Sequence, residues 1–344
     1  MTIQRREPVR VDRRRLLKKA GTLATGVVAA SFIGRIDRAM AAWPADRPVR
    51  IVVPNSPGGP SDITARFIAP ALQEALGGRF VIENRPGGSG NIGTTTLIRA
   101  EPDGYTFGVV TSGYAINASL RDPPPYDPFK DLVPVAELAS SPSMFVVRPD
   151  LGVNTMQEMV ALARKDQGKF NIGSPPLGST LHLGAELLKL REGLDKVAIV
   201  FYPGGGQAVL GILGGNVELC SSSLAPVHAL IKEGRLRGLA ILGDRRWHDL
   251  PDVPTAEEAG YKDFNFETCT ALMAPVSTPP QILRSVERAT LDALAKAELR
   301  EKIVSSGFLV QAKTGEEHMA RLVREVPMFR NIIKRAGIKA GGGG

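Results

Sequence analysis

The chain has 344 residues, of which 43% are hydrophobic and 23% are charged, as in an average soluble globular protein. This composition argues against a disordered chain, a fibrous protein and a membrane protein with several spans, and the length predicts about two domains. The formal net charge is +8, but residues 1–41 hold ten basic and three acidic side chains, whereas the rest of the chain holds 33 and 32. The remainder is therefore nearly neutral, and we expect no nucleic-acid partner.

The N-terminal segment has the features of an export signal. Residues 13–18 (RRRLLK) are similar to the twin-arginine motif, an apolar stretch follows at 20–34, and residues 39–41 (AMA) offer a small-x-small cleavage site. The apolar stretch is shorter than the roughly 20 residues that span a bilayer. We predict export to the periplasm by the twin-arginine or the Sec route, with cleavage near Ala41; an anchoring helix is the alternative. This segment and the glycine tail at 341–344 are left out of the fold prediction.

The first part of the remaining chain alternates strands and helices. A β-branched apolar run predicts a strand over 49–54, and apolar residues at helical spacing predict a helix over 63–76. A strand over 80–83, a helix over 94–100 and a strand over 106–111 are expected next. This order is typical of a mostly parallel sheet with helices on both faces.

A second α/β unit is expected after an apolar run at 144–148. Its predicted elements are helices over 156–165, 179–191, 207–214 and 226–233, and strands over 170–173, 196–201, 217–221 and 238–243. A strand over 267–275 and helices over 279–295 and 315–336 complete the chain. We predict an α/β fold of two lobes, each with a mixed sheet, and a ligand cleft between them.

Two glycine-rich loops lead from a predicted strand into a predicted helix. They are residues 57–62 (PGGPSD) and 173–180 (GSPPLGST). Glycines let a ligand approach the backbone closely, and a helix N-terminus presents unpaired N–H groups with a partial positive charge. The loops therefore predict binding of a carboxylate or phosphate, although Ser61, Asp62 and Ser179 are also ordinary capping residues.

Other motifs give no indication of catalysis. Residues 88–93 have GxGxxG spacing, but residues 84–87 separate them from their strand, which favours a structural turn over a dinucleotide site. No GxSxG, HExxH or Walker A motif is present. Cys220 and Cys269 either pair or are two buried thiols, and the four histidines lack metal-ligand spacing. We expect no enzyme, no cofactor and no metal.

Several segments together resemble the substrate-binding receptors of tripartite tricarboxylate transporters, the Bug family. They are residues 43–54, 57–62, 81–93 (VIENRPGGSGNIG), 102–106 (PDGYT), 126–132 (YDPFKDL), 250–255 (LPDVPT) and 336–339 (AGIK). The resemblance implies a two-lobed type II periplasmic-binding-protein fold, the Venus flytrap. One lobe would comprise residues 43–143 plus 268–340 and the other residues 144–267.

The resemblance also implies a function and a site. Receptors of this family bind a small organic acid and deliver it to a permease with a large and a small membrane subunit. The corresponding ligand-binding positions are Pro57, Gly58, Gly59, Ser61, Asp62, Ser112, Gly178, Ser179, Thr180, His182, Tyr202, Pro203, Gly204 and Ser222. His182 faces either the cleft or the surface. We expect a monomer; a periplasmic sensor for a two-component kinase, without transport, and an exported α/β hydrolase are the alternatives.

One departure from the family pattern bears on the ligand. Residues 220–223 read CSSS, where many members carry an acidic residue that can meet an amino group. Because burying an ammonium group without an anionic partner is costly, we predict a di-, tri- or aromatic carboxylate without an amino group. The sequence fixes neither the identity of that acid nor its affinity.

Overall fold

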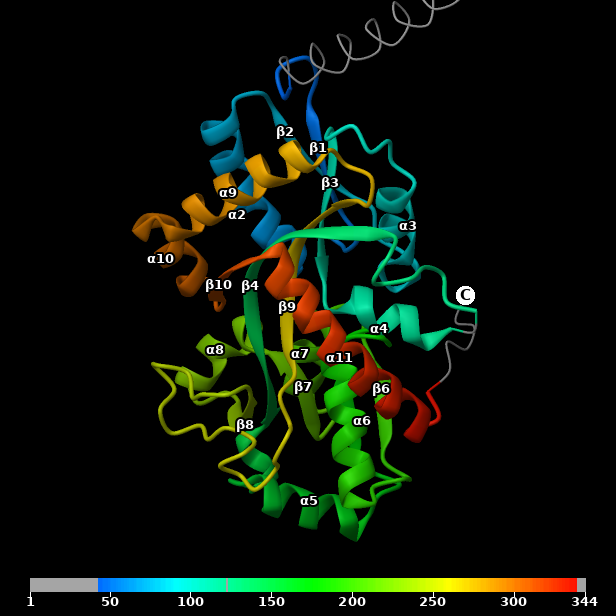
Figure 1. Ribbon diagram of the computed structural model, residues 1–344. Coiled ribbons are helices and arrows are strands. Elements are labelled where there is room, and N and C mark those ends of the chain that lie inside the picture. Colours follow the sequence, from blue (N-terminus) through cyan, green and yellow to red (C-terminus); the bar gives the residue numbers. More distant parts are fainter. Residues whose placement is uncertain (1–42, 122, 339–344) are drawn as a thin grey trace, which may run out of the picture.

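The computed structural model describes residues 43–121 and 123–338, so the predicted export signal lies outside the described residues. Figure 1 shows two α/β lobes, one above the other, joined by long strands that run between them. Strand order is β2 (Phe80–Asn84), β1 (Val49–Val53), β3 (Thr106–Thr111), β9 (Glu267–Pro275), β4 (Leu132–Val147), β7 (Leu219–Ser223), β5 (Asn171–Ser174) and β6 (Ala198–Phe201), with β10 (Leu309–Thr314) and β8 (Arg237–Leu242) also paired to β4. Among the described residues, no helix is long and apolar enough to cross a membrane.

The upper lobe has a mixed sheet. Its strands are β1 (Val49–Val53), β2 (Phe80–Asn84), β3 (Thr106–Thr111), β9 (Glu267–Pro275), the first part of β4 (Leu132–Val147), and β10 (Leu309–Thr314). β1 is parallel to β2 and β3, whereas β9 is antiparallel to β3 and β4. The carboxyl ends of β1 and β3 therefore lie at the same end of the sheet. The predicted loop 57–62 follows β1, and the predicted position Ser112 follows β3.

Helices cover both faces of this sheet. They are α2 (Pro60–Leu76), α9 (Pro280–Ala295) and α10 (Ala297–Ser305) on one side, and α3 (Asn91–Ile98), α4 (Gly113–Leu120) and α11 (Gly315–Arg335) on the other, with a 3₁₀ turn at η1 (Gly88–Gly90). Proline at the first helical position starts α2, and Gly77 with φ 74° ends it. Buried Ile68 and Leu72 of α2 pack on Ile51 of β1, which fixes the α2 N-terminus at the strand edge.

The lower lobe repeats this plan. Its strands are β5 (Asn171–Ser174), β6 (Ala198–Phe201), β7 (Leu219–Ser223) and β8 (Arg237–Leu242), and its helices are η2 (Pro149–Leu151), α5 (Met156–Lys165), α6 (Thr180–Glu192), α7 (Gly205–Leu213) and α8 (Leu224–Lys232). β5 lies parallel between β6 and β7, whereas β7 and β8 run antiparallel to β4. The loops after β5 and β6 again lead into helices.

β4 links the two lobes. Up to Pro142 it pairs with β9, and from Ser143 it pairs with β7 and β8. Helix α11 lies along the same junction and packs on both α4 and α6 (Figure 1). The change in the pairing partners of β4 after Pro142 supports the predicted lobe boundary at 143. The division into lobes at 143 and 267 stays a prediction.

Candidate functional site

The first predicted loop forms the entry to α2. Gly59 is the N-cap residue, Gly58 has φ +81°, and Pro57, Gly58 and Gly59 lie at the surface or half-buried. The first intrahelical bond is donated by Ile63 to the Gly59 carbonyl. The N–H groups of Ser61 and Asp62 precede that bond, so they are the donors that this helix end can offer to an anion.

The Ser61 and Asp62 side chains stabilise the conformation of this loop through hydrogen bonds. The Ser61 hydroxyl donates to Asn55 Oδ1 at 2.8 Å. The Asp62 carboxylate accepts from Gly58 N at 2.9 Å, from Arg66 at 2.9 Å and from Asn84 at 3.0 Å. Burial alone would raise the pKa of Asp62, but these hydrogen bonds outweigh burial and lower it. The structure thus gives Asp62 the role of an anchor, and leaves backbone N–H groups for a ligand.

The second predicted loop starts α6 in the lower lobe. Ser179 caps the helix by accepting a hydrogen bond from His182 N at 3.1 Å. The Thr180 hydroxyl lies 2.7 Å from the hydroxyl of Thr268 at the start of β9. Both side chains therefore have protein partners, and Thr180 ties α6 to the strand that crosses between the lobes.

His182 lies in the interior, with 1% of its surface exposed. Its Nδ1 accepts from Gly178 N at 3.4 Å, its Nε2 lies 3.5 Å from Glu186, and its ring meets the edge of Phe201. Burial raises the pKa of Glu186, but His182 and Lys189 outweigh burial and lower it. His182 is thus placed to orient the Gly178 loop. Its burial excludes the surface position considered from sequence, and a position facing the cleft stays a prediction.

The remaining predicted positions follow β3 and β6 or lie in β7. Gly204 is the N-cap of α7, preceded by Pro203, and the Tyr202 ring packs beneath that helix against Gly211. Ser222 is fully buried and donates to the Ser223 carbonyl at 3.0 Å. Ser112 exchanges two hydrogen bonds with Cys269, one from its N–H and one to its Oγ, each 3.0 Å long. The α7 entry is a third helix N-terminus at a strand end.

A series of contacts joins the upper and lower loops. Gly90 lies against Pro54 and Asn55, and Asn117 of α4 donates to the neighbouring Ser89 carbonyl at 2.6 Å. A Cβ on Gly178 would lie only 2.7 Å from Asn117 Oδ1. The two site loops are therefore bridged by the 88–90 segment and α4, and the lobes touch at Gly178.

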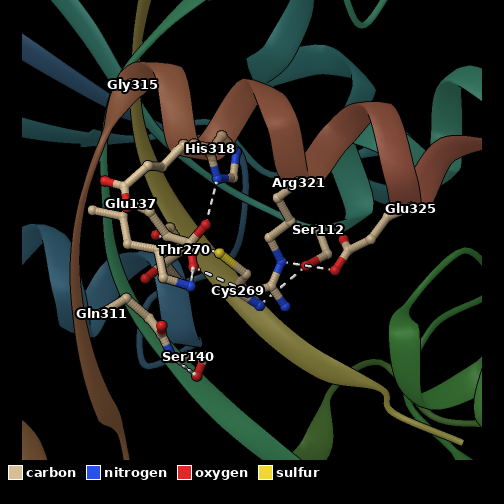
Figure 2. Close-up of polar contacts among 12 residues, drawn as sticks. Ser112, Glu137, Ser140, Cys269, Thr270, Gln311, Gly315, His318, Arg321 and Glu325 are labelled. Carbon is tan, nitrogen blue, oxygen red and sulfur yellow. Dashed lines mark hydrogen bonds and ion pairs between the residues drawn. The ribbon is translucent and has the colours of Figure 1, made fainter. Parts of the chain in front are cut away.

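A buried charged cluster lies behind Ser112 (Figure 2). Glu137 of β4 accepts from His318 Nδ1 at 2.9 Å and from Arg321 Nη1 at 3.0 Å, both from α11. Burial raises the pKa of Glu137, but the His318 hydrogen bond and the nearby cations outweigh burial and hold it at about 2. This cluster was not predictable from the sequence, because no local motif connects residues 181 positions apart.

The two cysteines are free and buried, so of the two alternatives considered from sequence the buried thiols are correct. Burial raises the pKa of Cys220 to about 12, and it raises that of Cys269 well above the ordinary value. Only a thiolate is an effective nucleophile. Neither thiol is therefore suited to covalent catalysis.

A hollow of about 650 Å³ lies between α8 and α10, on the surface of both lobes. Its lining includes His228, Trp247 and Asp249 from the lower lobe and Arg300 from the upper one. None of the predicted ligand-binding residues lines this hollow. Its size alone does not make it the capture site, and the predicted ligand-binding positions lie elsewhere, at the helix entries and strand ends.

Comparison with known proteins identifies the family. Residues 64–338 match the family described as tripartite tricarboxylate transporter family receptor. The chain belongs to this receptor family. BugT of Bordetella pertussis is 33% identical over 295 residues, which cover 85% of this chain and 90% of BugT. The expected membership of the Bug-type receptors is thus confirmed.

Solved relatives confirm the two-lobed type II fold of this tripartite tricarboxylate receptor. A protein of R. palustris with adipate is 31% identical, with a TM-score of 0.79, and the match covers 86% of this chain and 99% of that one. MatC from Rhodopseudomonas palustris, with bound malate, is 27% identical with a TM-score of 0.76, over 84% of this chain and 99% of MatC. The family consists of receptors, in line with the expected absence of catalysis.

Proposed function

We propose that this receptor captures a small carboxylate in the periplasm and passes it to a tripartite tricarboxylate permease. The observation that carries the proposal is the pair of helix entries, at Gly59 of α2 and Ser179 of α6, one in each lobe. Each entry presents backbone N–H groups where an anion is stabilised by the helix dipole. The family membership and the relatives with adipate and malate support the same ligand class.

Capture would follow from closure of the two lobes. A ligand that contacts both helix entries favours the closed arrangement by the contacts it makes only there. The hydrogen bonds of Asp62, Ser179 and His182 keep the two loops in shape before the ligand arrives. Preorganised donors of this kind lower the cost of binding.

The proposed ligand carries no amino group. Ser221 and Ser222 stand where an acidic partner would be needed, and both are fully buried. The Ser221 hydroxyl is already used, since it donates to the Leu181 carbonyl at 2.8 Å. Stronger binding of aspartate than of succinate or adipate in calorimetry would contradict this part of the proposal.

The test is a matched pair of substitutions at Gly59. Its φ of −79° suits any residue, and a Cβ there meets nothing closer than 3.4 Å. Both Gly59→Asp and Gly59→Asn supply a good N-cap, but only Asp adds a negative charge to the carboxylate site. A thermal-shift screen of organic acids first identifies an acid that binds the parent. We expect Gly59→Asp to weaken binding of that acid at least about tenfold, a loss of about 1.4 kcal/mol, while Gly59→Asn binds nearly as the parent. Equal affinities in the two variants would reject the helix-entry site.

A further inference from the structure

Three potential metal-binding side chains meet in the interior. They are Glu137 of β4, Cys269 of β9 and His318 of α11, and Figure 2 shows them facing one another. A carboxylate oxygen, the sulfur and an imidazole nitrogen all lie within 4.8 Å of one another. The three residues are 0%, 2% and 5% exposed. No other such group of three occurs among residues 43–121 and 123–338.

We propose that this triad binds one divalent transition metal ion, with Zn²⁺ as the ion that fits best. Zinc sites in proteins combine thiolate, imidazole and carboxylate ligands at about 2.0–2.3 Å. Donor atoms around such an ion lie about 3–4 Å apart. The present spacing of up to 4.8 Å therefore needs only small movements of side chains that are already directed inward.

The surroundings hold the ligands in place. The Oε2 atom of Glu137 faces His318, whereas Oε1 accepts from Arg321 at 3.0 Å and lies 3.6 Å from Lys313 Nζ. Cys269 is fixed by the two hydrogen bonds between its backbone and Ser112. Outer hydrogen bonds that orient a ligating carboxylate are a regular part of metal sites.

The charges around the triad can accommodate a divalent cation. Arg321 also pairs with Glu325 at 2.7 Å and lies 3.9 Å from Glu267. With the metal bound, four negative charges face four positive ones. The negative charges are those of Glu137, Glu267, Glu325 and the Cys269 thiolate, and the positive charges are those of Arg321, Lys313 and the divalent ion. Binding releases the Cys269 thiol proton to solvent, and His318 would bind through Nδ1 as a neutral imidazole with its proton on Nε2.

The competing explanation is an ion-pair network without a metal. In that network His318 pairs with Glu137, and the Cys269 thiol is a neutral neighbour of Glu137. In a metal site the same sulfur atom is a ligand. The two explanations therefore differ in what replacement of Cys269 does to the bound metal. Cys220 provides the control, because it is also a buried free thiol but belongs to no such group of three among the described residues.

The test uses Co²⁺ as a spectroscopic substitute for Zn²⁺. Because the triad is buried, the full chain is unfolded, refolded with Co²⁺ and dialysed, and its fold is checked by circular dichroism. We expect one Co²⁺ per chain, a thiolate-to-cobalt charge-transfer band, and a higher melting temperature than that of protein refolded with chelator. Zn²⁺ added before refolding should abolish the band.

The variants decide between the explanations. Cys269→Ala should lose the band and the bound metal, His318→Gln should lose most of the bound metal, and Cys220→Ala should keep both. The proposal is overturned if refolded parent protein holds no cobalt, or if Cys269→Ala retains one ion per chain. Should one variant fail to refold, the parent stoichiometry and the other variant still decide. These experiments do not measure ligand binding by the receptor. If the metal proposal fails, the proposed function is therefore unaffected.

Discussion

Replacement of Gly178 by alanine perturbs one of the contacts between the lobes. The new Cβ would lie 2.7 Å from both Asn117 Oδ1 and Leu120 Cδ1 of α4. Overpacking of this kind costs about 1–3 kcal/mol. Because the proposed capture brings the lobes together and this clash opposes their approach, we expect the affinity for the carboxylate to drop about 5- to 150-fold.

The same substitution carries a second cost that needs a control. Gly178 has φ +84°, and a left-handed conformation costs a residue with a Cβ roughly 1–2 kcal/mol. Gly193, at the other end of α6, has φ +62°, but a Cβ there meets nothing within 4 Å. Gly178→Ala and Gly193→Ala should therefore lose similar stability in urea unfolding, while only Gly178→Ala loses affinity in calorimetry with adipate or with the acid found by screening.

Small-angle scattering adds the conformational readout. We expect the parent and Gly193→Ala to become more compact when the acid is added, and Gly178→Ala to need much more acid for the same change. Adding Asn117→Ala to Gly178→Ala removes one of the two clashes and should recover part of the affinity. The reasoning is refuted if Gly178→Ala binds as tightly as Gly193→Ala.

Two further substitutions test the supports of the site loops. Asp62→Asn should destabilise the protein by about 1.5–3 kcal/mol at pH 7, since it weakens charge-assisted bonds from Arg66. Because the pKa of Asp62 is lowered from 3.8 on folding, this difference should persist above pH 4 and shrink as the pH falls further; a constant difference down to pH 2 in urea unfolding would contradict it. Thr180→Val should cost about 0.5–1.5 kcal/mol through the lost bond to Thr268, and an unchanged unfolding midpoint would show that this bond is not a stabilising tie.

Local patterns predicted much of the fold. The apolar run at 49–54 and the helical spacing over 63–76 correspond to β1 and α2. By contrast, most of β4 was missed, because it is buried on both faces and carries Pro134 and Pro142, which argue against a strand. The register shift after Pro134 shows how the sheet accommodates one of them. Helix α4 was missed because nearly all of its side chains are buried, which leaves no amphipathic pattern.

The site was predictable only where its chemistry is local. Glycines and capping residues marked the entries of α2 and α6 from the sequence alone. The partners of His182 were not predictable, because its burial depends on Phe201 from a distant strand. The contact of Gly178 with Asn117 and the Glu137 cluster likewise arise from packing between elements far apart in the chain.

The most direct test of the central claim is calorimetry of the refolded receptor with organic acids. Refolding removes any acid that accompanies the protein through purification. Titration with succinate, adipate, malate, citrate, terephthalate and aspartate should give one-to-one binding for at least one acid without an amino group, and that acid should raise the melting temperature. Absence of binding for every acid, with the protein folded, would contradict carboxylate capture at the two helix entries.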